Sequence, residues 1–414
     1  MAVRITSEIG VLEHVICHEP GPELSVVTPR NARAYLFDDL LDEEASRQEH
    51  RVFRAVLERF CQVSEVKDLL TEVLEDPDAR EFVVAHADEG VRDQAAGKSP
   101  GELATLFIEG KRAEIAPARG ETLARLLNER GYLLPPLPNL LFARDAACVI
   151  GDRAVIGAMA HEVRWTEELI MRALFRFHPR LEAGGLIHDE VKRRRLNTSV
   201  EGGDIHVLRE DLLLVGLSER TSAAGVGALV ETLFASTAIH DVLVVLMPRE
   251  RAAIHLDMIF TMIDRGVCCV FPPHFVGPTR LPVIHIAKGR DTASEREGLF
   301  EALRAVGLTL EPIFCGGPRR TQQEREQWGS GCNMFAVAPG NVLAYDRNDE
   351  TLAALEREGG YQVVTAAGFL ATEEPNGTST AERRVITFRG SELVRGGGGP
   401  RCMTLPLSRR DVAW

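Results

Sequence analysis

The sequence lacks any long apolar segment. No stretch of about 18 consecutive apolar residues occurs in the chain, and a helix needs about that many to cross a bilayer. The first residues also lack the basic flank, apolar run and small-residue cleavage site of a signal peptide. We therefore expect neither a membrane-spanning helix nor a secretory leader.

Paired cysteine motifs are also absent. The eight cysteines are scattered, none occurs in a CxxC motif, and most lie within apolar runs. This pattern predicts reduced, buried thiols in the cytoplasm, and it argues against a disulfide framework or a zinc site.

Positive charge is scarce. The 61 acidic residues outnumber the 48 lysines and arginines, which gives a formal net charge of -13 over 414 residues. An acidic surface argues against nucleic acid and membranes as partners.

Two sequence textures divide the chain. Residues 9–18 alternate in a way that predicts a strand, whereas residues 31–130 carry apolar residues at i, i+3 and i+4 spacing, which predicts helices. Within the helical stretch, residues 99–102 (SPGE) have the pattern of a helix N-terminal capping box. We therefore expect an inserted all-helical subdomain at 31–130 and a main domain made of residues 1–30 and 131–414.

Four stretches of the main domain resemble one another. They begin at Asp145, Asp204, Asp257 and Asn333, and each runs as a short strand, turns at a polar or glycine pair and returns as an apolar strand. Helical segments and further apolar strands follow, so the repeat predicts modules of the form strand–turn–strand–helix–strand. If the modules surround a pseudo-axis, their leading residues converge there, and the segment with Cys402 supplies the last module.

Residues 366–390 interrupt the last repeat. Their composition predicts a surface loop or an extra hairpin. They carry no functional signal.

A glycine-rich segment delivers one cysteine to the start of a predicted strand. Residues 396–399 are four consecutive glycines, which favour neither helix nor strand interior, and Cys402 follows after Pro400 and Arg401. Such a loop makes a thiol reachable and offers N–H groups that stabilise its anion, as nucleophilic cysteine chemistry requires. The alternative interpretation is a glycine-rich turn followed by a small buried residue.

Three further motifs combine carboxylates with a histidine: PNLLFARD (138–145), EGGD (201–204) and IHLD (254–257). Each alone is also compatible with a turn or a hydrogen-bonded core residue. Together with Cys402 they offer a thiol, an imidazole and several carboxylates. Buried carboxylates without a cation are costly, so the set predicts a planar cation with many N–H donors, that is, a guanidinium. Zinc is the competing interpretation, and the spacing and the number of carboxylates argue against it.

The order of these motifs resembles that of the arginine deiminases of the guanidino-modifying (pentein) superfamily. PNxxFxRD, EGGD, HLD and RCMTxP occur in this order, with SERT at 218–221 and YDRN at 345–348, and the resemblance covers essentially the whole chain. It implies an α/β fold, a five-fold pseudosymmetric α/β propeller, and hydrolysis of free L-arginine to L-citrulline and ammonia. It also implies that no metal or organic cofactor takes part, and that the chain forms a homo-oligomer, a dimer or a tetramer.

The resemblance implies roles for the residues that match the family motifs. Cys402 is similar to the nucleophile that attacks the guanidinium carbon, His255 to the general acid/base, and Glu201 to the carboxylate that orients the imidazole. Asp145 and Asp257 resemble the pair that grips the guanidinium nitrogens.

The other matched positions concern substrate binding. Arg164 and Arg220 match residues that bind the substrate carboxylate, and Asn139 and Phe142 match residues that line the substrate's stem. Asp204 is assigned to the substrate-binding residues as a support of the network around Glu201 and His255. For the two arginines, the alternative is a solvated position on the surface.

One position departs from the family pattern. Some relatives carry an arginine five residues before the nucleophile, where this chain has Gly397. Arg395 or Arg401 could compensate. The departure concerns affinity for the substrate carboxylate, not the chemistry.

Three other functions compete with arginine hydrolysis. Agmatine or a methylated arginine is a possible substrate for the same fold, although Arg164 and Arg220 argue against agmatine because it has no carboxylate. Amidinotransfer would need an acceptor amine site. A non-catalytic binding protein would be expected to have lost at least one of the charged site residues, because such buried charges give little net stability.

Overall fold

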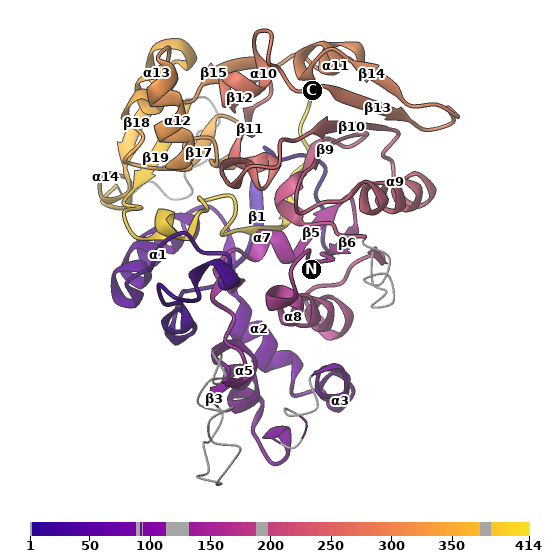
Figure 1. Cartoon of the computed structure of the whole chain (residues 1–414), viewed down its shortest axis with the longest axis vertical. Helices are drawn as coiled ribbons and strands as arrows, with labels where there is room; N and C mark the ends of the chain where they lie inside the picture. The colour runs from indigo at the N-terminus through magenta and orange to yellow at the C-terminus, as the bar shows by residue number, and fades with distance from the viewer. Residues whose placement is uncertain (1, 88–91, 93, 113–131, 188–197, 373–381) are drawn as a thin grey trace.

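The computed structural model of the chain describes residues 2–87, 92, 94–112, 132–187, 198–372 and 382–414. It has a mixed α/β part and, at the bottom of the view, a smaller lobe that contains helices α2 (Val66–Val73), α3 (Pro77–His86) and α5 (Pro100–Glu109) (Figure 1). None of the helices in these ranges has the length and apolar character needed to cross a membrane.

Five sheets in the described ranges share one pattern: an antiparallel pair of strands, with a third strand parallel to the second. Four of them are β5 (Ala147–Ile150), β6 (Arg153–Ile156) and β7 (Leu186–Ile187); β8 (Ile205–Arg209), β9 (Leu212–Leu217) and β10 (Asp241–Leu246); β11 (Phe260–Asp264), β12 (Val267–Val270) and β15 (Glu311–Phe314); and β16 (Phe335–Ala338), β17 (Asn341–Tyr345) and β19 (Arg384–Phe388). These sheets confirm the strand–turn–strand repeats predicted from the sequence.

The fifth sheet joins the two ends of the chain. Strand β20 (Leu405–Arg409) pairs antiparallel with β1 (Leu12–Cys17), and β2 (Gln62–Glu65) lies parallel to β1 on its other side. The strand predicted at residues 9–18 is therefore confirmed. The hairpin-like pair of this sheet is made by segments nearly 400 residues apart, since Val15 is opposite Pro406.

Two of the sheets carry extra strands. Strand β13 (Val283–Ala287) adds to β10 and β14 (Ser294–Arg296) adds to β13, while β18 (Gln362–Thr365) adds to β19.

Helices connect the second strand of each sheet to a later strand. They are α1 (Glu43–Leu57), α8 (Trp165–Phe177), α9 (Ala223–Ser236), α10 (Pro272–Phe275), α11 (Leu299–Ala305), α13 (Asp349–Gly359) and α14 (Ala366–Leu370), whereas α12 (Arg320–Trp328) lies between β15 and β16. Local sequence sets their ends. In α1, the Asp42 carboxylate accepts a hydrogen bond from the Ala45 N–H group, and α13 ends at Gly360, whose φ of 66° is left-handed.

Short single-turn helices lie at the points where the chain enters the sheets or crosses between them. They are η1 (Pro22–Val26), η2 (Ala32–Tyr35), η3 (Pro138–Leu141), α7 (Ala143–Ala146), η4 (Glu162–Arg164), η6 (Gly202–Asp204), η7 (Arg251–Ala253), η8 (Leu256–Met258) and η9 (Leu393–Gly396).

The helices of the smaller lobe lie within the stretch for which the sequence predicted helices. Helix α5 begins with the predicted capping box, in which the Glu102 N–H group donates to Ser99 Oγ over 3.3 Å and the Ser99 N–H group donates to Glu102 Oε2 over 2.8 Å. Helix α2 packs on α5 and on α8, and a two-stranded ribbon of β3 (Lys111–Arg112) and β4 (Tyr132–Leu134) closes the lobe. The helical prediction at residues 121–131 lies outside the described residues.

Two elements inside the expected helical insertion belong to the sheets instead. Strand β2 pairs with β1, and α1 packs against α14 and β19. The amphipathic period of residues 43–57 predicted a helix but could not tell whether its apolar face lies on other helices or on a sheet.

The prediction for residues 366–390 was partly wrong. Residues 366–370 form helix α14, and β19 is a buried strand between β17 and β18. The apolar run VITF within β19 is the signal for a strand covered on both faces. Residues 373–381 lie outside the described ranges.

Two clusters of buried apolar side chains fill the α/β part. One contains Phe53, Phe260 and Phe335, and the other extends from the β5–β10 strands into the helical lobe. Leu141 belongs to the first cluster and Ala143 to the second, so the segment that leads into β5 lies where the two meet.

Candidate active site

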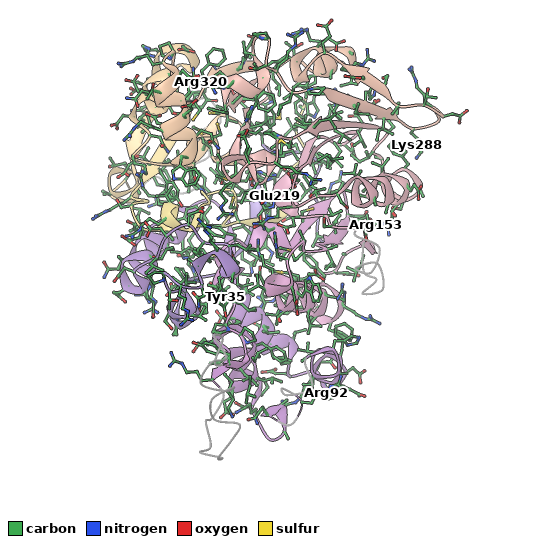
Figure 2. The ribbon with its side chains drawn as sticks, viewed as in Figure 1. Tyr35, Arg92, Arg153, Glu219, Lys288 and Arg320 are labelled. Atoms are coloured by element: carbon green, nitrogen blue, oxygen red, sulfur yellow. The ribbon has the colours of Figure 1, made fainter. Side chains whose placement is uncertain are left out.

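Short segments that precede the first strands of the five sheets supply the chemical groups. Asp145 lies in α7 before β5, Glu201 directly precedes η6 and β8, and His255 directly precedes η8 and β11. Asn333 precedes β16, and Cys402 precedes β20. Because η6 contacts both α7 and η8, these segments meet, as the repeat in the sequence predicted. In the view of Figure 2, the exposed Glu219, which precedes Arg220, lies near the middle of the picture, whereas Arg320, Lys288 and Arg92 lie towards its edges.

The loop that carries Cys402 is closely packed. A Cβ atom added at Gly398 would lie 2.5 Å from an atom of the Phe142 ring, and one added at Gly399 would lie 2.8 Å from the Asn333 carbonyl oxygen. Only glycine allows this approach. The close packing holds the thiol in place, and Cys402 is 4% exposed.

Asn333 contacts this cysteine through its amide. Its Nδ2 lies 3.0 Å from Cys402 Sγ and 3.1 Å from the Asp257 carbonyl oxygen, while its Oδ1 accepts hydrogen bonds from the N–H groups of Arg401 and Cys402 over 3.0 and 3.1 Å. Sequence reasoning named Asn333 as the leading residue of the fourth module but did not assign it to the site. The signal was its position, which matches that of the leading aspartates.

His255 is held by carboxylates. Its Nε2 lies 2.8 Å from Glu201 Oε2, and its Nδ1 lies 3.6 Å from Asp145 Oδ1. Burial alone would lower the pKa of His255, but the charge of Asp145 and the hydrogen bond to Glu201 raise it to about 9. Burial would likewise raise the pKa of Glu201, but the charge of Arg220 and the bond to His255 lower it to about 2. His255 is therefore protonated at neutral pH and Glu201 is ionised.

Only one of the two carboxylate oxygens of Asp145 has a hydrogen-bond partner among the described residues. Its Oδ2 accepts a hydrogen bond from Arg164 Nη1 over 2.6 Å, and its buried Oδ1 has no hydrogen-bond partner in the described part of the chain. Arg164 is itself buried, and it also donates to Glu167 over 2.7 Å and to the carbonyl oxygens of Asn139 and Phe142. The structure thus turns this guanidinium inward, so the alternative of a solvated surface arginine is wrong for Arg164.

Asp257 is built in the same way beside the cysteine. Its Oδ2 accepts a hydrogen bond from Arg401 Nη1 over 2.9 Å and lies 3.5 Å from Cys402 Sγ, and its buried Oδ1 has no hydrogen-bond partner among the described residues. Arg401 also donates to Glu8 Oε2 over 3.1 Å and to the Ile205 carbonyl oxygen over 2.7 Å. Sequence reasoning considered Arg401 only as a residue that could compensate for Gly397, and it missed Glu8 altogether.

The thiol of Cys402 is neutral in this environment. Burial raises its pKa well above the ordinary value, and the charges of Asp257 and Asp145 raise it further, against the lowering by the Gly399 N–H group and Arg401. A cation bound between the two aspartates would remove most of that repulsion and favour the thiolate.

Asp204 supports the backbone and does not line the cavity. Its Oδ1 accepts a hydrogen bond from the Leu256 N–H group over 2.9 Å, and its Oδ2 accepts one from Ser218 Oγ over 2.7 Å. The same Ser218 Oγ accepts from the Arg220 N–H group over 3.0 Å. Asp204 therefore joins the segment after His255 to the SERT turn and does not face the substrate directly.

A narrow cavity of about 20 Å³ lies in front of Cys402 and His255. Asn139, Phe142 and Asp145 also line it, as do Arg164 and Arg220, whereas Glu201, Asp257 and Asp204 lie behind its wall. A cavity of this volume can hold about one water molecule, since about 10–15 Å³ suffices for one. It is too small for a molecule of the size of arginine, so side chains around it must move to admit a substrate. A cavity of about 320 Å³ adjoins it and shares Arg251, Ile254, Met258 and Gly397 with it.

An arginine from another loop lies close to Gly397. Arg251 Nη2 lies 3.7 Å from a Cβ atom added at Gly397, and Arg251 lines the narrow cavity. Arg395 instead pairs with Asp39, and Arg401 is buried against Asp257. Of the two compensating residues named from the sequence, neither lines the narrow cavity.

Asp145, Glu201 and His255 lie close enough together to be considered as metal ligands. However, both carboxylates already face guanidinium groups, Asp145 that of Arg164 and Glu201 that of Arg220. A cationic imidazole is also not a metal ligand. The donor set therefore fits an ion-pair network better than a metal centre.

Comparison of the sequence with known proteins finds relatives that match almost the whole chain. The family model described as arginine deiminase matches residues 33–409. The chain is 34% identical to the arginine deiminase of Rhodococcus erythropolis over 98% of this chain and 97% of that protein. It is 32% identical to the arginine deiminase of Borrelia garinii subsp. bavariensis over 99% and 98% of the two chains, respectively.

Solved structures with similar folds are more distant in sequence. An amidinotransferase from Microseira wollei, of the saxitoxin biosynthetic pathway, has a TM-score of 0.56 at 13% identity, covering 99% of this chain and 98% of that one. A dimethylarginine dimethylaminohydrolase from Pseudomonas aeruginosa, complexed with citrulline, has a TM-score of 0.51 at 15% identity over 96% and 99% of the two chains, respectively. These likenesses show that the chain has the mixed α/β pentein fold.

Proposed function

Because this chain belongs to the arginine deiminase family, we propose that it hydrolyses free L-arginine to L-citrulline and ammonia. The observation that carries the proposal is the pair of buried aspartates on either side of the reacting groups. Oδ1 of Asp145 and Oδ1 of Asp257 both lack a hydrogen-bond partner in the described ranges. Buried carboxylate oxygens without partners are costly, and the N–H groups of a substrate guanidinium would satisfy both.

Substrate binding would activate the nucleophile. The guanidinium brings a positive charge between Asp145 and Asp257, which are the two charges that raise the thiol pKa after burial itself. The Cys402 thiol would then release its proton to solvent water and present a thiolate to the guanidinium carbon. The bound substrate thus supplies the positive charge that Cys402 needs in order to become a nucleophilic thiolate.

The first half-reaction would release ammonia. A bond forms between Cys402 Sγ and the guanidinium carbon, and the tetrahedral adduct then breaks one C–N bond. His255, protonated at neutral pH, donates its proton to the departing nitrogen, which leaves as ammonia. The product of this step is an amidino group attached to sulfur, and Glu201 stabilises the imidazole orientation.

The second half-reaction would release citrulline. The now neutral His255 accepts a proton from a water molecule while the water oxygen bonds to the amidino carbon. The C–S bond then breaks and Cys402 leaves as a thiolate, while the new hydroxyl group releases its proton to solvent water as the carbonyl of citrulline forms. The chain's own side chains, the substrate and water balance every step.

The proposed partners of the substrate carboxylate are Arg220 and Arg251. Both line the narrow cavity, and Arg251 opens onto the larger adjoining one. Arg164 would act on the substrate indirectly, by fixing the orientation of Asp145. Asn139 and Phe142 would line the aliphatic part of the substrate.

We propose a five-fold pseudosymmetric propeller for the α/β part. The five sheets with one shared pattern support this arrangement, as does the meeting of their leading segments. We also propose that the catalytic domain consists of residues 1–30 and 131–414 together with residues 43–65, and that the helical subdomain begins at α2. A cytoplasmic homo-oligomer is the proposed state of the protein.

Product analysis tests the proposed reaction. Purified protein incubated with L-arginine should yield citrulline and ammonia in equal amounts, and the C402A variant should yield neither. Absence of citrulline from folded wild-type protein would contradict the proposal. Turnover that appears only when an amine acceptor is added would instead indicate amidinotransfer.

Selectivity for the carboxylate is tested with R251Q. We expect the variant to raise KM for L-arginine about tenfold or more, whereas turnover of agmatine, which has no carboxylate, should equal that of wild type. R395Q is the matched control, because Arg395 pairs with Asp39 as Arg251 pairs with Asp38, but Arg395 does not line the narrow cavity. Equal losses on both substrates would assign Arg251 a structural role only.

A further inference from the structure

The side-chain amide of Asn333 is fully satisfied, and its orientation is fixed by the backbone. Oδ1 accepts two N–H groups, those of Arg401 and Cys402. An N–H group cannot donate to an amide nitrogen, so the amide cannot be reversed without leaving both donors unpaired. Nδ2 must therefore face the Asp257 carbonyl oxygen and the Cys402 sulfur.

The contact with the sulfur suits a thiolate better than a thiol. Nδ2 lies 3.0 Å from Sγ and the whole Asn333 side chain is buried. A neutral thiol is a weak acceptor, whereas a hydrogen bond to an anion in a buried site is about twice as strong as one between neutral groups. The donor thus favours the charged state of the nucleophile, which burial and two aspartates oppose.

We propose that Asn333 is a catalytic residue that stabilises the Cys402 thiolate through its Nδ2–H group, and that its Oδ1 holds the loop so that the sulfur stays in reach. This inference deepens the proposed function and rests on it for the identity of the nucleophile. The same group would stabilise the thiolate twice in each turnover, before attack on the guanidinium and when the C–S bond breaks.

Two substitutions separate the two roles of the amide. N333D keeps the oxygen that accepts from both backbone N–H groups but replaces the donor with a second, negatively charged oxygen. N333A removes the donor and the acceptor without adding charge. Tyr345→Phe is the matched control, because the Tyr345 hydroxyl donates to the Gly398 carbonyl oxygen of the same loop over 3.1 Å and does not contact the sulfur.

The direct measurement is the pH dependence of Cys402 alkylation by iodoacetamide, followed by mass spectrometry of the peptide that contains it. We expect the alkylation midpoint to move to higher pH in both N333D and N333A, with rates at neutral pH about tenfold or more below wild type. Citrulline formation should fall by about 10²-fold or more in both variants. Y345F should keep the wild-type midpoint, and thermal unfolding identifies any variant that fails to fold.

Two outcomes would overturn the inference. One is an unchanged alkylation midpoint in both folded Asn333 variants. The other is an equal shift in Y345F, which would mean that any weakening of the loop has the same effect. Alkylation requires no arginine turnover, so a failure of the proposed function would appear separately, as wild-type protein that forms no citrulline.

Discussion

The two halves of the site, one around His255 and one around Cys402, are built alike but balanced differently. In each half a buried aspartate gives one oxygen to an internal arginine, and its other oxygen has no hydrogen-bond partner among the described residues. Each arginine is then held by a glutamate, Arg164 by Glu167 and Arg401 by Glu8. Both aspartates are thereby oriented before any substrate arrives.

The difference lies in the surplus of charge. The half around His255 contains four carboxylates and two arginines, namely Asp145, Glu167, Glu201, Asp204, Arg164 and Arg220. Its surplus of negative charge keeps the imidazole protonated. It also means that not every carboxylate can be ionised, since burial raises the pKa of Glu167 to about 7 and that of Asp204 to about 6.

The half around Cys402 is balanced. Asp257 and Glu8 face Arg401 and Arg144, the buried Arg409 lies near Glu8 and both of these arginines, and the thiol stays neutral. Burial would raise the pKa of Glu8, but the charges of Arg401 and Arg144 hold it far below the usual range. The comparison teaches that the number of charged groups around each side chain sets its protonation state. His255 is kept charged and Cys402 is kept neutral, so that substrate binding changes only the protonation state of Cys402.

The largest effects should come from the two aspartates themselves. D145N and D257N should each lower kcat/KM for L-arginine by roughly 10²–10³-fold, because each leaves the substrate guanidinium without a charged partner. Their secondary effects should differ: D145N should lower the pKa of His255 as well as that of the Cys402 thiol, whereas D257N should lower only that of the thiol. Steady-state kinetics against pH and alkylation rates check both, and identical pH profiles would contradict the division into halves.

A somewhat smaller loss is expected for E201Q. Removing the carboxylate that bonds His255 Nε2 should lower the imidazole pKa from about 9, so the alkaline limb of the kcat/KM profile should move to lower pH. We expect a loss of about 10–100-fold at pH 8, with a smaller loss at pH 6. A uniform loss at all pH values would indicate displaced geometry instead.

Glu8 and Glu167, which hold Arg401 and Arg164, provide a matched pair of variants. E8Q should leave Arg401 and Arg144 in excess, lower the pKa of the Cys402 thiol and speed its alkylation by several-fold while weakening substrate binding. E167Q should do neither, because its charge lies in the other half and is already partly lost near pH 7. Equal alkylation rates in both variants would refute the charge balance proposed for Cys402.

The smallest effect concerns folding stability. The pKa of His255 is higher in the folded protein than the ordinary value of 6.5, so its stabilisation is full below about pH 6.5 and is lost as pH rises through 9. H255Q should therefore have a free energy of unfolding that falls less than that of wild type between pH 6.5 and 9.5, by about 3 kcal/mol. Urea denaturation at the two pH values measures this, and H240Q, at a half-exposed histidine, should behave as wild type.

Much of the fold could be predicted because the repeat is local. Strands that turn at a glycine or polar pair reveal themselves over a dozen residues, and the leading residues Asp145, Asp257 and Asn333 could be placed together from that repeat alone. The assignment of residues 43–65 and of β19 could not be made, because the period of a helix or strand does not specify which surface it covers.

The partners of the site residues were the least predictable part. Arg401 contacts Glu8 across 393 positions of sequence, and Arg164 faces Asp145 where the motif indicated a substrate ligand. Such pairings depend on how elements distant in the chain approach one another. The amide of Asn333 was visible in the repeat, but its contact with the sulfur depends on the glycine loop that brings Cys402 beside it.

The pairing of β1 with β20 has a consequence for biosynthesis. During translation, β1 is synthesised long before its antiparallel partner β20. The edge of β1 that pairs with β20 therefore stays unpaired until nearly the whole chain has been made. The nucleophile arrives with that partner, after every other catalytic group has been synthesised. A nascent chain therefore remains inactive until its last sheet closes, and premature termination anywhere before β20 yields a protein without activity.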